Sequence, residues 1–232
     1  MIEKKSELKE EGFLIMALEN EHPAEAACDS SSSIYGPFRP QMEQVMKEVL
    51  NRISSIRSQM SVRFGMDPVE HCLARIKSED SMREKCRRRN LPETTESALN
   101  IITDAIGIRV VVAFVDDVYT IRDYLARMED YEVIQEKDYI RHAKPNGYRS
   151  YHMILRAHRK YYVEIQLRTI SMDTWAALEH HLKYKKTLNG NTQLIVQELK
   201  RCADELASTD LSMQTIRDMI MEEGDGDETT AR

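Results

Sequence analysis

The segment from Tyr161 to Thr169 places an acid, an amide and a guanidinium side by side. Its residues alternate strictly between apolar and polar character, and a period of two over this length predicts a β-strand. Glu164, Gln166 and Arg168 would then share one face of that strand. A strand that merely faces solvent can show such a face by chance. A site for a nucleotide polyphosphate requires one, because it needs both a metal-binding carboxylate and cationic donors.

A turn and a second alternating run precede this strand. Residues 144–147 read Lys-Pro-Asn-Gly, which is typical of a turn, and Tyr148, Ser150 and His152 after it would share a face. The short connection His158–Lys160 joins the two runs, so together they predict a β-hairpin. One face of the hairpin would present two aromatic rings, one carboxylate and several hydrogen-bond donors.

Basic residues gather in the segment before these strands, at Arg75, Lys77, Arg83, Lys85, Arg87, Arg88 and Arg89. On a helix predicted over residues 69–90, Lys77, Ser81 and Lys85 fall at i, i+4 and i+8 and would form one line of phosphate donors. Taken alone, a basic helix face is more often simply solvated.

A second acidic residue accompanies Glu164. Asp104 precedes an apolar run over residues 107–115 that predicts another strand. Two carboxylates on neighbouring strands can hold a hard cation whose octahedron is completed by phosphate oxygens. Taken alone, Asp104 is more often a turn or cap residue.

Composition limits the alternatives. The chain has 232 residues, of which 41% are hydrophobic and 31% charged, which suits one sizeable core with additional helices or tails. A net charge of −6 argues against a protein that coats nucleic acid in bulk. The four cysteines lie far apart, so neither a disulfide framework nor a structural zinc site is expected. The apolar runs are too short for a bilayer span or a signal core, which favours a cytoplasmic protein.

The order of elements predicts an α+β fold with a mixed sheet, flanking helices and a C-terminal helical extension. Residues 1–39 are expected to form a weakly ordered arm, residues 40–190 the main domain, residues 191–222 a helix and residues 223–232 a disordered acidic tail. Within the domain we expect a helix over residues 41–60, a helix after residue 117 capped by Asp116 or Asp117, a short strand near residues 131–135, and a helix over residues 173–185 with Trp175, Leu178 and Leu182 inward.

The C-terminal helix carries an apolar stripe in alternating steps of four and three residues: Ile195, Leu199, Cys202, Leu206, Thr209, Met213, Ile216 and Ile220. This spacing is typical of a coiled-coil seam. Packing on its own domain and self-association are about equally compatible with it.

Taken together, these segments resemble the RelA/SpoT-type alarmone synthetases, specifically the small, synthetase-only GTP pyrophosphokinases. The resemblance covers about residues 41 to 190. Its motifs are Arg75–Ser78 with Ser81 and Lys85, Asp104-x-x-Gly107-x-Arg109, Lys137–Ile140, Lys144–His152, Val163–Thr169 and Met172–His180. It implies a nucleotidyltransferase-like fold and transfer of pyrophosphate from ATP to the 3′-hydroxyl of a guanosine nucleotide. No hydrolase region is recognised, so alarmone hydrolysis is not expected.

The resemblance also implies a role for each donor-side residue. Arg75 and Arg109 would sandwich the adenine of ATP, and a line of residues, Lys77, Ser81 and Lys85, would hold its triphosphate. Asp104 and Glu164 would be the catalytic pair and bind Mg²⁺. Glu164 would in addition orient or deprotonate the acceptor hydroxyl.

On the acceptor side, the resemblance implies that Tyr148 stacks on guanine. Lys137, Lys144 and His152 would reach the acceptor phosphates. Gln166 and Arg168 would support the shared face, and Asn146 belongs to the same acceptor-binding turn. The choice among GTP, GDP and GMP stays open.

Assembly and regulation follow from the same resemblance. Small synthetases of this kind commonly form homotetramers, and some are activated by their own product. An aromatic ring that stacks on that effector is replaced here by His71, and a basic residue that assists it by Ser54, so we expect little activation.

Two other functions remain open from the sequence. One is a toxic relative that pyrophosphorylates adenosine nucleotides or the tRNA 3′ end. The other is a catalytically silent nucleotide or RNA sensor. Arg87–Arg89 could support weak RNA binding, but the net negative charge counts against a tRNA substrate, and the presence of Asp104 and Glu164 argues against a silent sensor.

Overall fold

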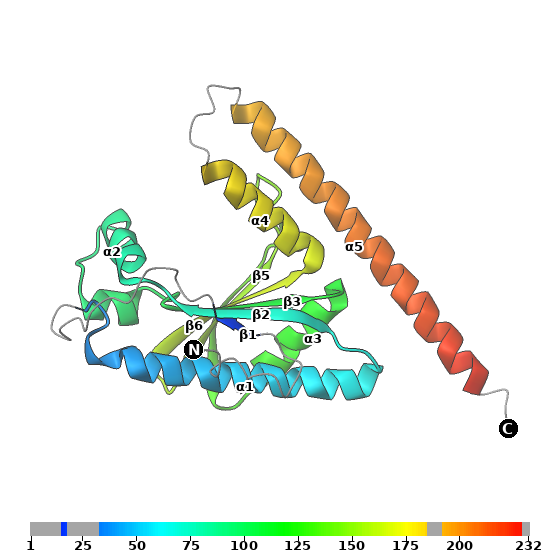
Figure 1. Ribbon diagram of the computed structural model, residues 1–232, viewed down its shortest axis with the longest axis horizontal. Coiled ribbons are helices and arrows are strands. Elements are labelled where there is room, and N and C mark those ends of the chain that lie inside the picture. Colours follow the sequence, from blue (N-terminus) through cyan, green and yellow to red (C-terminus); the bar gives the residue numbers. More distant parts are fainter. Residues whose placement is uncertain (1–14, 18–32, 185–191, 229–232) are drawn as a thin grey trace, which may run out of the picture.

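A six-stranded mixed sheet forms the centre of the molecule (Figure 1). The computed structural model describes residues 15–17, 33–184 and 192–228. The strands are β1 (Ile15–Ala17), β2 (Val69–Ile76), β3 (Ile106–Val112), β4 (Tyr131–Asp138), β5 (Tyr151–Ala157) and β6 (Tyr161–Thr169). Their order across the sheet is β1-β2-β3-β6-β5-β4. The β1–β2 and β3–β6 pairs are parallel and the others antiparallel, which confirms the predicted mixed sheet and α+β class.

Two helices cover one face of the sheet, α1 (Arg39–Phe64) and α3 (Val115–Ala126). The apolar positions of α1 recur at helical spacing and are buried together with the inward residues of β5 and β6, such as Leu155 and Ile165. The opposite face, here called the site face, carries the alternate polar residues of β6. The strict alternation seen in the sequence therefore separates core from site.

The hairpin of β5 and β6 is confirmed. Their pairing runs from Tyr151 opposite Leu167 to Ala157 opposite Tyr161. At its tip, His158 and Arg159 have positive φ angles of 50° and 56°. A two-residue turn with both residues at positive φ has a twist that matches the right-handed twist of the strands that it joins. Tyr148 and Ser150 lie in the loop before β5, so of the three residues expected to share a strand face only His152 belongs to a strand.

The helix predicted over residues 69–90 is wrong in its first half. This segment forms β2, then a short loop, then α2 (Glu79–Arg88), capped by the Ser78 side chain. Lys77 therefore lies in the loop before the helix and does not share a helical face with Ser81 and Lys85. A β-bulge between Val69 and His71 shifts the strand register and hides the period of two.

Several boundaries differ from the predicted ones. Strand β3 ends at Val112 and β4 extends to Asp138. Helix α3 begins at Val115 with Phe114 as its N-cap, so Asp116 and Asp117 lie in its first turn and neither is the cap. Acidic residues in the first turn still interact favourably with the positive end of the helix dipole.

Two parts of the predicted N-terminal arm contribute to the fold. Within the described residues, Ile15–Ala17 pair with β2, and Ile34 and Tyr35 are buried in the core. The Tyr35 hydroxyl donates a 2.6 Å hydrogen bond to the backbone oxygen of Lys77, which fixes the loop after β2. A 3₁₀ turn, η1 (Gly36–Phe38), leads into α1, and a π-helical turn, η2 (Ser97–Ile101), leads toward β3.

The last helices lie on the site-face side of the sheet: α4 (Ile170–Tyr184) and α5 (Thr192–Glu228). Trp175 is buried as predicted, but Leu178 and Leu182 are 58% and 53% exposed, so their predicted inward orientation is wrong. The buried stripe of α4 is instead Met172, Trp175 and Glu179. None of the described helices is both long and apolar enough for a bilayer crossing.

Helix α5 passes residue 222, where the sequence predicted its end, and residues 229–232 of the predicted tail lie outside the described part of the chain. It packs on the domain with a stripe that includes Ala203, Asp210 and Gln214, all buried. The predicted seam is rotated away from that stripe, and Met213, Ile216 and Ile220 are exposed.

Candidate active site

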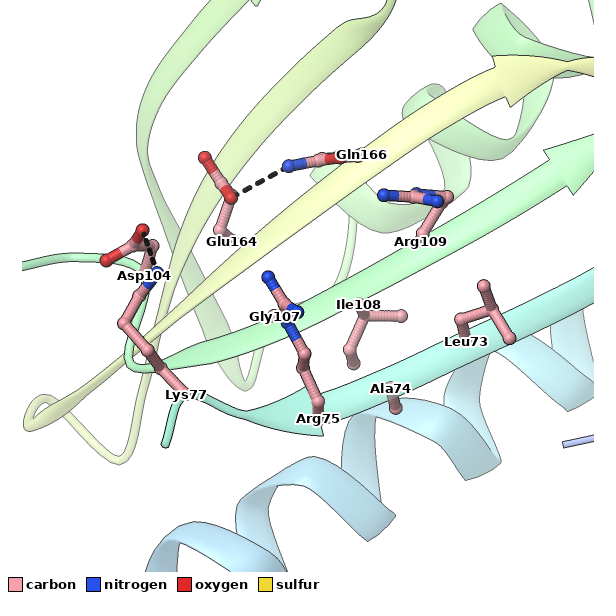
Figure 2. A pocket seen from close by; sticks show the side chains of 10 residues that line it. All are labelled: Leu73, Ala74, Arg75, Lys77, Asp104, Gly107, Ile108, Arg109, Glu164 and Gln166. Carbon is pink, nitrogen blue, oxygen red and sulfur yellow. Dashed lines mark hydrogen bonds and ion pairs between the residues drawn. The ribbon is translucent and has the colours of Figure 1, made fainter. Parts of the chain in front are cut away.

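A pocket on the site face lies across β2, β3 and β6. Its volume is about 520 Å³, including the part that opens to solvent. The residues that line it include Arg75, Lys77, Asp104, Gly107, Arg109, Glu164 and Gln166. Figure 2 shows Asp104 and Lys77 at one end, Arg109 at the other, and Glu164 and Arg75 between them. The sheet register produces this order, because Gly107 pairs with both Arg75 and Glu164.

Gly107 forms the floor between these side chains. A Cβ at this position would meet nothing closer than the backbone oxygen of Arg75, at 4.0 Å. The fold therefore does not require glycine here. Its missing side chain leaves open the space between Arg75 and Glu164.

Asp104 forms ion pairs with two ammonium groups at one end of the pocket. Its Oδ2 lies 3.2 Å from Lys77 Nζ and also bonds Lys85 Nζ. Its Oδ1 is buried and has no hydrogen-bond partner in the described part of the chain. An unpaired buried carboxylate oxygen is costly, so this atom is a candidate ligand for a cation.

Glu164 is a second anionic centre. Burial raises the pKa of its carboxyl, but His152, a hydrogen bond from Gln166 and the Lys85 charge outweigh this and lower the pKa to about 2. His152 Nδ1 lies 3.6 Å from Glu164 Oε1, and Gln166 Nε2 donates to Oε2 at 3.0 Å. Glu164 is thus charged at neutral pH.

The two guanidinium groups predicted to hold a base have different surroundings. Arg75 is exposed, whereas Arg109 is half-buried and its Nη1 lies 3.2 Å from Asp173 Oδ1. Burial and the neighbouring Arg168 charge lower the pKa of Arg109, and the Asp173 charge opposes this shift. Arg109 is the anchored member of the pair and Arg75 the freer one.

The predicted acceptor side forms an aromatic and cationic cluster beside the pocket. The Tyr148 hydroxyl lies 2.9 Å from His152 Nε2 and accepts a 2.7 Å hydrogen bond from Arg168 Nη2. Lys144 Nζ lies 4.6 Å from the centre of the Tyr148 ring and 4.5 Å from that of Tyr139. A base stacking on this ring face would displace the Lys144 ammonium.

The cluster lies next to the pocket because of the register across β6, β5 and β4. His152 pairs with Gln166 on one side and with Lys137 on the other. Lys137 is exposed at the outer strand, on the same face as His152.

Three predicted site residues form hydrogen bonds with other protein side chains. The Ser81 hydroxyl accepts a 2.8 Å hydrogen bond from the Ser78 hydroxyl in the first turn of α2. Asn146 Nδ2 donates to Glu179 Oε1 at 3.1 Å, which ties the turn to α4. Arg168 is only 4% exposed and bonds the Ser150 hydroxyl, Tyr148, Gln166 and Asp173. Neither Ser81 nor Asn146 lines the pocket of Figure 2.

Sequence reasoning missed the role of Asp173. Its Oδ1 contacts both Arg109 and Arg168, and its Oδ2 lies 3.8 Å from His71 Nε2. The available signal was Arg168 itself, because a buried guanidinium needs a counter-charge.

Helix α5 supports the turn that carries Tyr148. Gly147, at φ +92°, packs so closely on α5 that a Cβ would lie 2.6 Å from Ala203 Cβ. Arg149 Nη2 lies 2.8 Å from Asp204 Oδ1, and Trp175 Nε1 donates to the Leu199 oxygen at 2.9 Å. The C-terminal helix is therefore part of the site's support.

Comparison with known proteins places this geometry in a family. Residues 74–189 match the model described as "Region found in RelA / SpoT proteins". The chain is 38% identical to GTP pyrophosphokinase YwaC of Bacillus subtilis over 66% of this chain and 76% of that protein. It is 30% identical to GTP pyrophosphokinase YjbM of the same organism over 80% of this chain and 88% of that protein.

Solved structures agree. The small alarmone synthetase 1 of Bacillus subtilis bound to its product pppGpp superimposes with a TM-score of 0.69 at 30% identity, over 79% of this chain and 95% of that one. A GTP pyrophosphokinase family protein from Streptococcus pneumoniae gives 0.69 at 34% identity, over 80% and 94%. The site and these matches together show that the chain belongs to the RelA/SpoT family, among its small alarmone synthetases of the GTP pyrophosphokinase type.

Proposed function

We propose that this enzyme transfers the β,γ-pyrophosphate of ATP to the 3′-hydroxyl of GDP or GTP and so makes (p)ppGpp. The observation that carries the proposal is the order of groups along one pocket: two guanidiniums, an open glycine floor, a carboxylate, and then two ammoniums around a second carboxylate. That order follows the parts of a nucleoside triphosphate, from base to terminal phosphate. Relatives whose structures hold pppGpp and AMPCPP support it.

The donor nucleotide fits with its adenine between Arg75 and Arg109, over Gly107. Guanidinium planes stack on a base and carry charge, which suits a purine bearing phosphates. The triphosphate would then extend toward Lys77 and Lys85. Both ammoniums pair with Asp104, which holds them at that end of the pocket.

The donor set fits a magnesium ion held by Asp104 and Glu164. The unpartnered Asp104 Oδ1 is a ready ligand, and both residues line the pocket. No group of three or more His, Cys, Asp or Glu side chains able to hold a metal occurs among the described residues, so substrate oxygens would complete the shell. When bound, the ion neutralises charge on the phosphates during transfer.

The acceptor nucleotide fits with its guanine on Tyr148 after Lys144 has moved toward the phosphates. The 3′-hydroxyl would donate a hydrogen bond to the ionised Glu164. Glu164 is ionised, so it can orient this hydroxyl and accept its proton as the O3′–Pβ bond forms. The O3′–Pβ bond forms, the bond from Pβ to the α–β bridging oxygen breaks, AMP leaves, and the proton passes to the solvent.

We also propose that the enzyme assembles into oligomers through α5, with a homotetramer as the expected state. Met213, Ile216 and Ile220 lie along one stripe of that helix and are each at least 49% exposed. Apolar side chains gathered in this way favour association. Deleting α5 is a poor test, because the same helix supports the acceptor turn through Ala203 and Asp204.

The test of the function is acceptor labelling. Purified protein is incubated with Mg²⁺, γ-labelled ATP and one of GTP, GDP, GMP, AMP or tRNA. Label on GDP or GTP, with release of AMP, is the expected result. Label only on AMP or tRNA would assign the enzyme to the toxic relatives, and no label on any acceptor would indicate a silent sensor.

A further inference from the structure

One carboxylate contacts both sides of the site. Asp173 lies in the first turn of α4, and its side chain is 17% exposed. Its Oδ1 is 3.2 Å from Arg109 Nη1 and 3.0 Å from Arg168 Nη1. Its Oδ2 is 3.8 Å from His71 Nε2. A single side chain thus joins residues of β3, β6 and β2.

On the acceptor side, Asp173 neutralises a buried arginine. Arg168 Nη2 donates to the Tyr148 hydroxyl at 2.7 Å and to Gln166 Oε1 at 2.9 Å. Gln166 in turn donates to Glu164 at 3.0 Å. Without the Asp173 charge, Arg168 would be a buried cation lacking its carboxylate, and the side chains that it holds would lose their fixed positions.

On the donor side, Asp173 holds Arg109 at the end of the pocket. The Arg109 Nε atom is buried and has no hydrogen-bond partner within the described residues, so the Nη1 contact to Asp173 anchors this guanidinium. Arg109 and Arg168 carry like charges and share the same carboxylate oxygen. The anion between them therefore lets two cations stay close to each other.

We propose that Asp173 is a positioning residue that fixes the donor and acceptor nucleotides relative to each other. The inference rests on the proposed function, in which Arg109 carries the adenine and Arg168 holds Tyr148 under the guanine. Transfer requires both nucleotides in register at the same time, and a small misplacement is costly. A shared anchor also makes each bound nucleotide order the site for the other.

The test is D173N, which keeps the shape of the side chain and one acceptor oxygen but removes the charge. Binding of AMPCPP and of GDP is measured separately by calorimetry, and each is repeated with the other nucleotide present. Both affinities should fall about tenfold, as expected for the loss of a hydrogen bond to a charged group. R75A should weaken AMPCPP alone, and Y148F should weaken GDP alone.

The matched control is D117N. Asp117 is also buried and pairs with one arginine, Arg217, at 3.2 Å, but it lies on α3, away from the pocket. D117N likewise removes a buried, arginine-paired carboxylate, and it should leave both affinities unchanged. In the wild type, each nucleotide should tighten binding of the other, and D173N should remove this effect.

The outcomes are distinct. Weakening of one nucleotide alone, or loss of stability with both affinities intact, would refute the positioning role. If D173N does not fold, the neutral pair R168Q/D173N removes both buried charges and should again weaken both nucleotides. Failure of the wild type to bind GDP would refute the proposed function, whereas tight binding of both nucleotides by folded D173N would refute only this inference.

Discussion

The close approach of Gly147 to α5 makes G147A an informative change. Gly147 has φ +92°, and an added Cβ would lie 2.6 Å from Ala203 Cβ and 3.0 Å from Lys200 Cα. Ordinary carbon contacts are about 3.5–4.0 Å, so the turn or the helix must move by about 1 Å. Because Tyr148 is the next residue, the movement reaches the proposed guanine platform directly.

The cost of this change has two parts. A positive φ at a residue with a side chain costs about 1–3 kcal/mol, and overpacking costs about 1–3 kcal/mol more. Their sum, roughly 2–6 kcal/mol, is a large share of the roughly 5–15 kcal/mol that stabilises a domain. The movement will therefore take up much of the strain, and the KM for the acceptor should rise while the KM for ATP stays near its original value.

Two further variants separate the parts. Gly65 has φ +70°, and a Cβ added there would have no neighbour within 4 Å, so G65A measures the cost of positive φ alone. A203G removes the nearest clashing atom at a helix-propensity cost of about 1 kcal/mol. In a double-mutant cycle, G147A/A203G should recover part of the stability and of the acceptor KM that G147A loses.

The assay is denaturant unfolding together with initial rates, varying each nucleotide at saturation of the other. If G147A costs no more stability than G65A and leaves the acceptor KM unchanged, then α5 does not support the turn, and the packing argument fails.

Other predictions concern the catalytic face and the helix surface. E164Q should keep nucleotide binding but lose at least about 100-fold in turnover, and near-normal synthesis would show that the site is misassigned. Y148A should lose about 1–3 kcal/mol of base stacking, seen as a higher acceptor KM, whereas weaker ATP binding would mean that the two pockets are exchanged. The pKa of Glu164 is lowered from 4.5 to about 2 in the folded protein, so its stabilisation is complete above pH 4.5 and is lost as the pH falls toward 2; the free energy of unfolding of the wild type should fall relative to that of E164Q over this interval. Light scattering should show a smaller oligomer for M213S/I216S/I220S, and a wild type that is monomeric at micromolar concentration would remove the assembly proposal.

The sequence predicted the central hairpin well because its period of two is unbroken. Burial alternates along β6 as far as Leu167, with Glu164 and Gln166 on the less buried face, and a strand buried on one face must keep that register. The turn at Gly147 was also readable from its residue types. In β6 and at Gly147, the structure indicated by the local sequence is also the one that the tertiary contacts require.

The secondary structure and the buried face were predicted wrongly at segments whose sequence fits more than one structure, so that tertiary contacts determine which one forms. In β2, Val69, Cys72, Leu73 and Ile76 fall at i, i+3, i+4 and i+7, which is the signature of a helix, and the bulge after Val69 removes the competing alternation. On α4, the predicted stripe of Trp175, Leu178 and Leu182 is more apolar than the buried stripe of Met172, Trp175 and Glu179. The packing of α4 decided which stripe is buried.

The role of Asp173 could not be derived from sequence spacing. Its contacts with Arg109 and His71 depend on how α4 crosses the site face after β6 ends. Only the nearby Arg168, five residues earlier on the chain, lies within local reach.

The dependence of the acceptor turn on α5 has a consequence for synthesis of the protein on the ribosome. The sheet and its pocket are complete once residue 169 has emerged, but Ala203 and Asp204, which support Gly147 and Arg149, are translated later. Because chains fold from the N-terminus as they are made, a nascent chain would hold a formed donor pocket before it holds a supported acceptor turn. With the proposed assignment of the two nucleotide sites, translation products truncated before Ala203 should bind ATP without making alarmone.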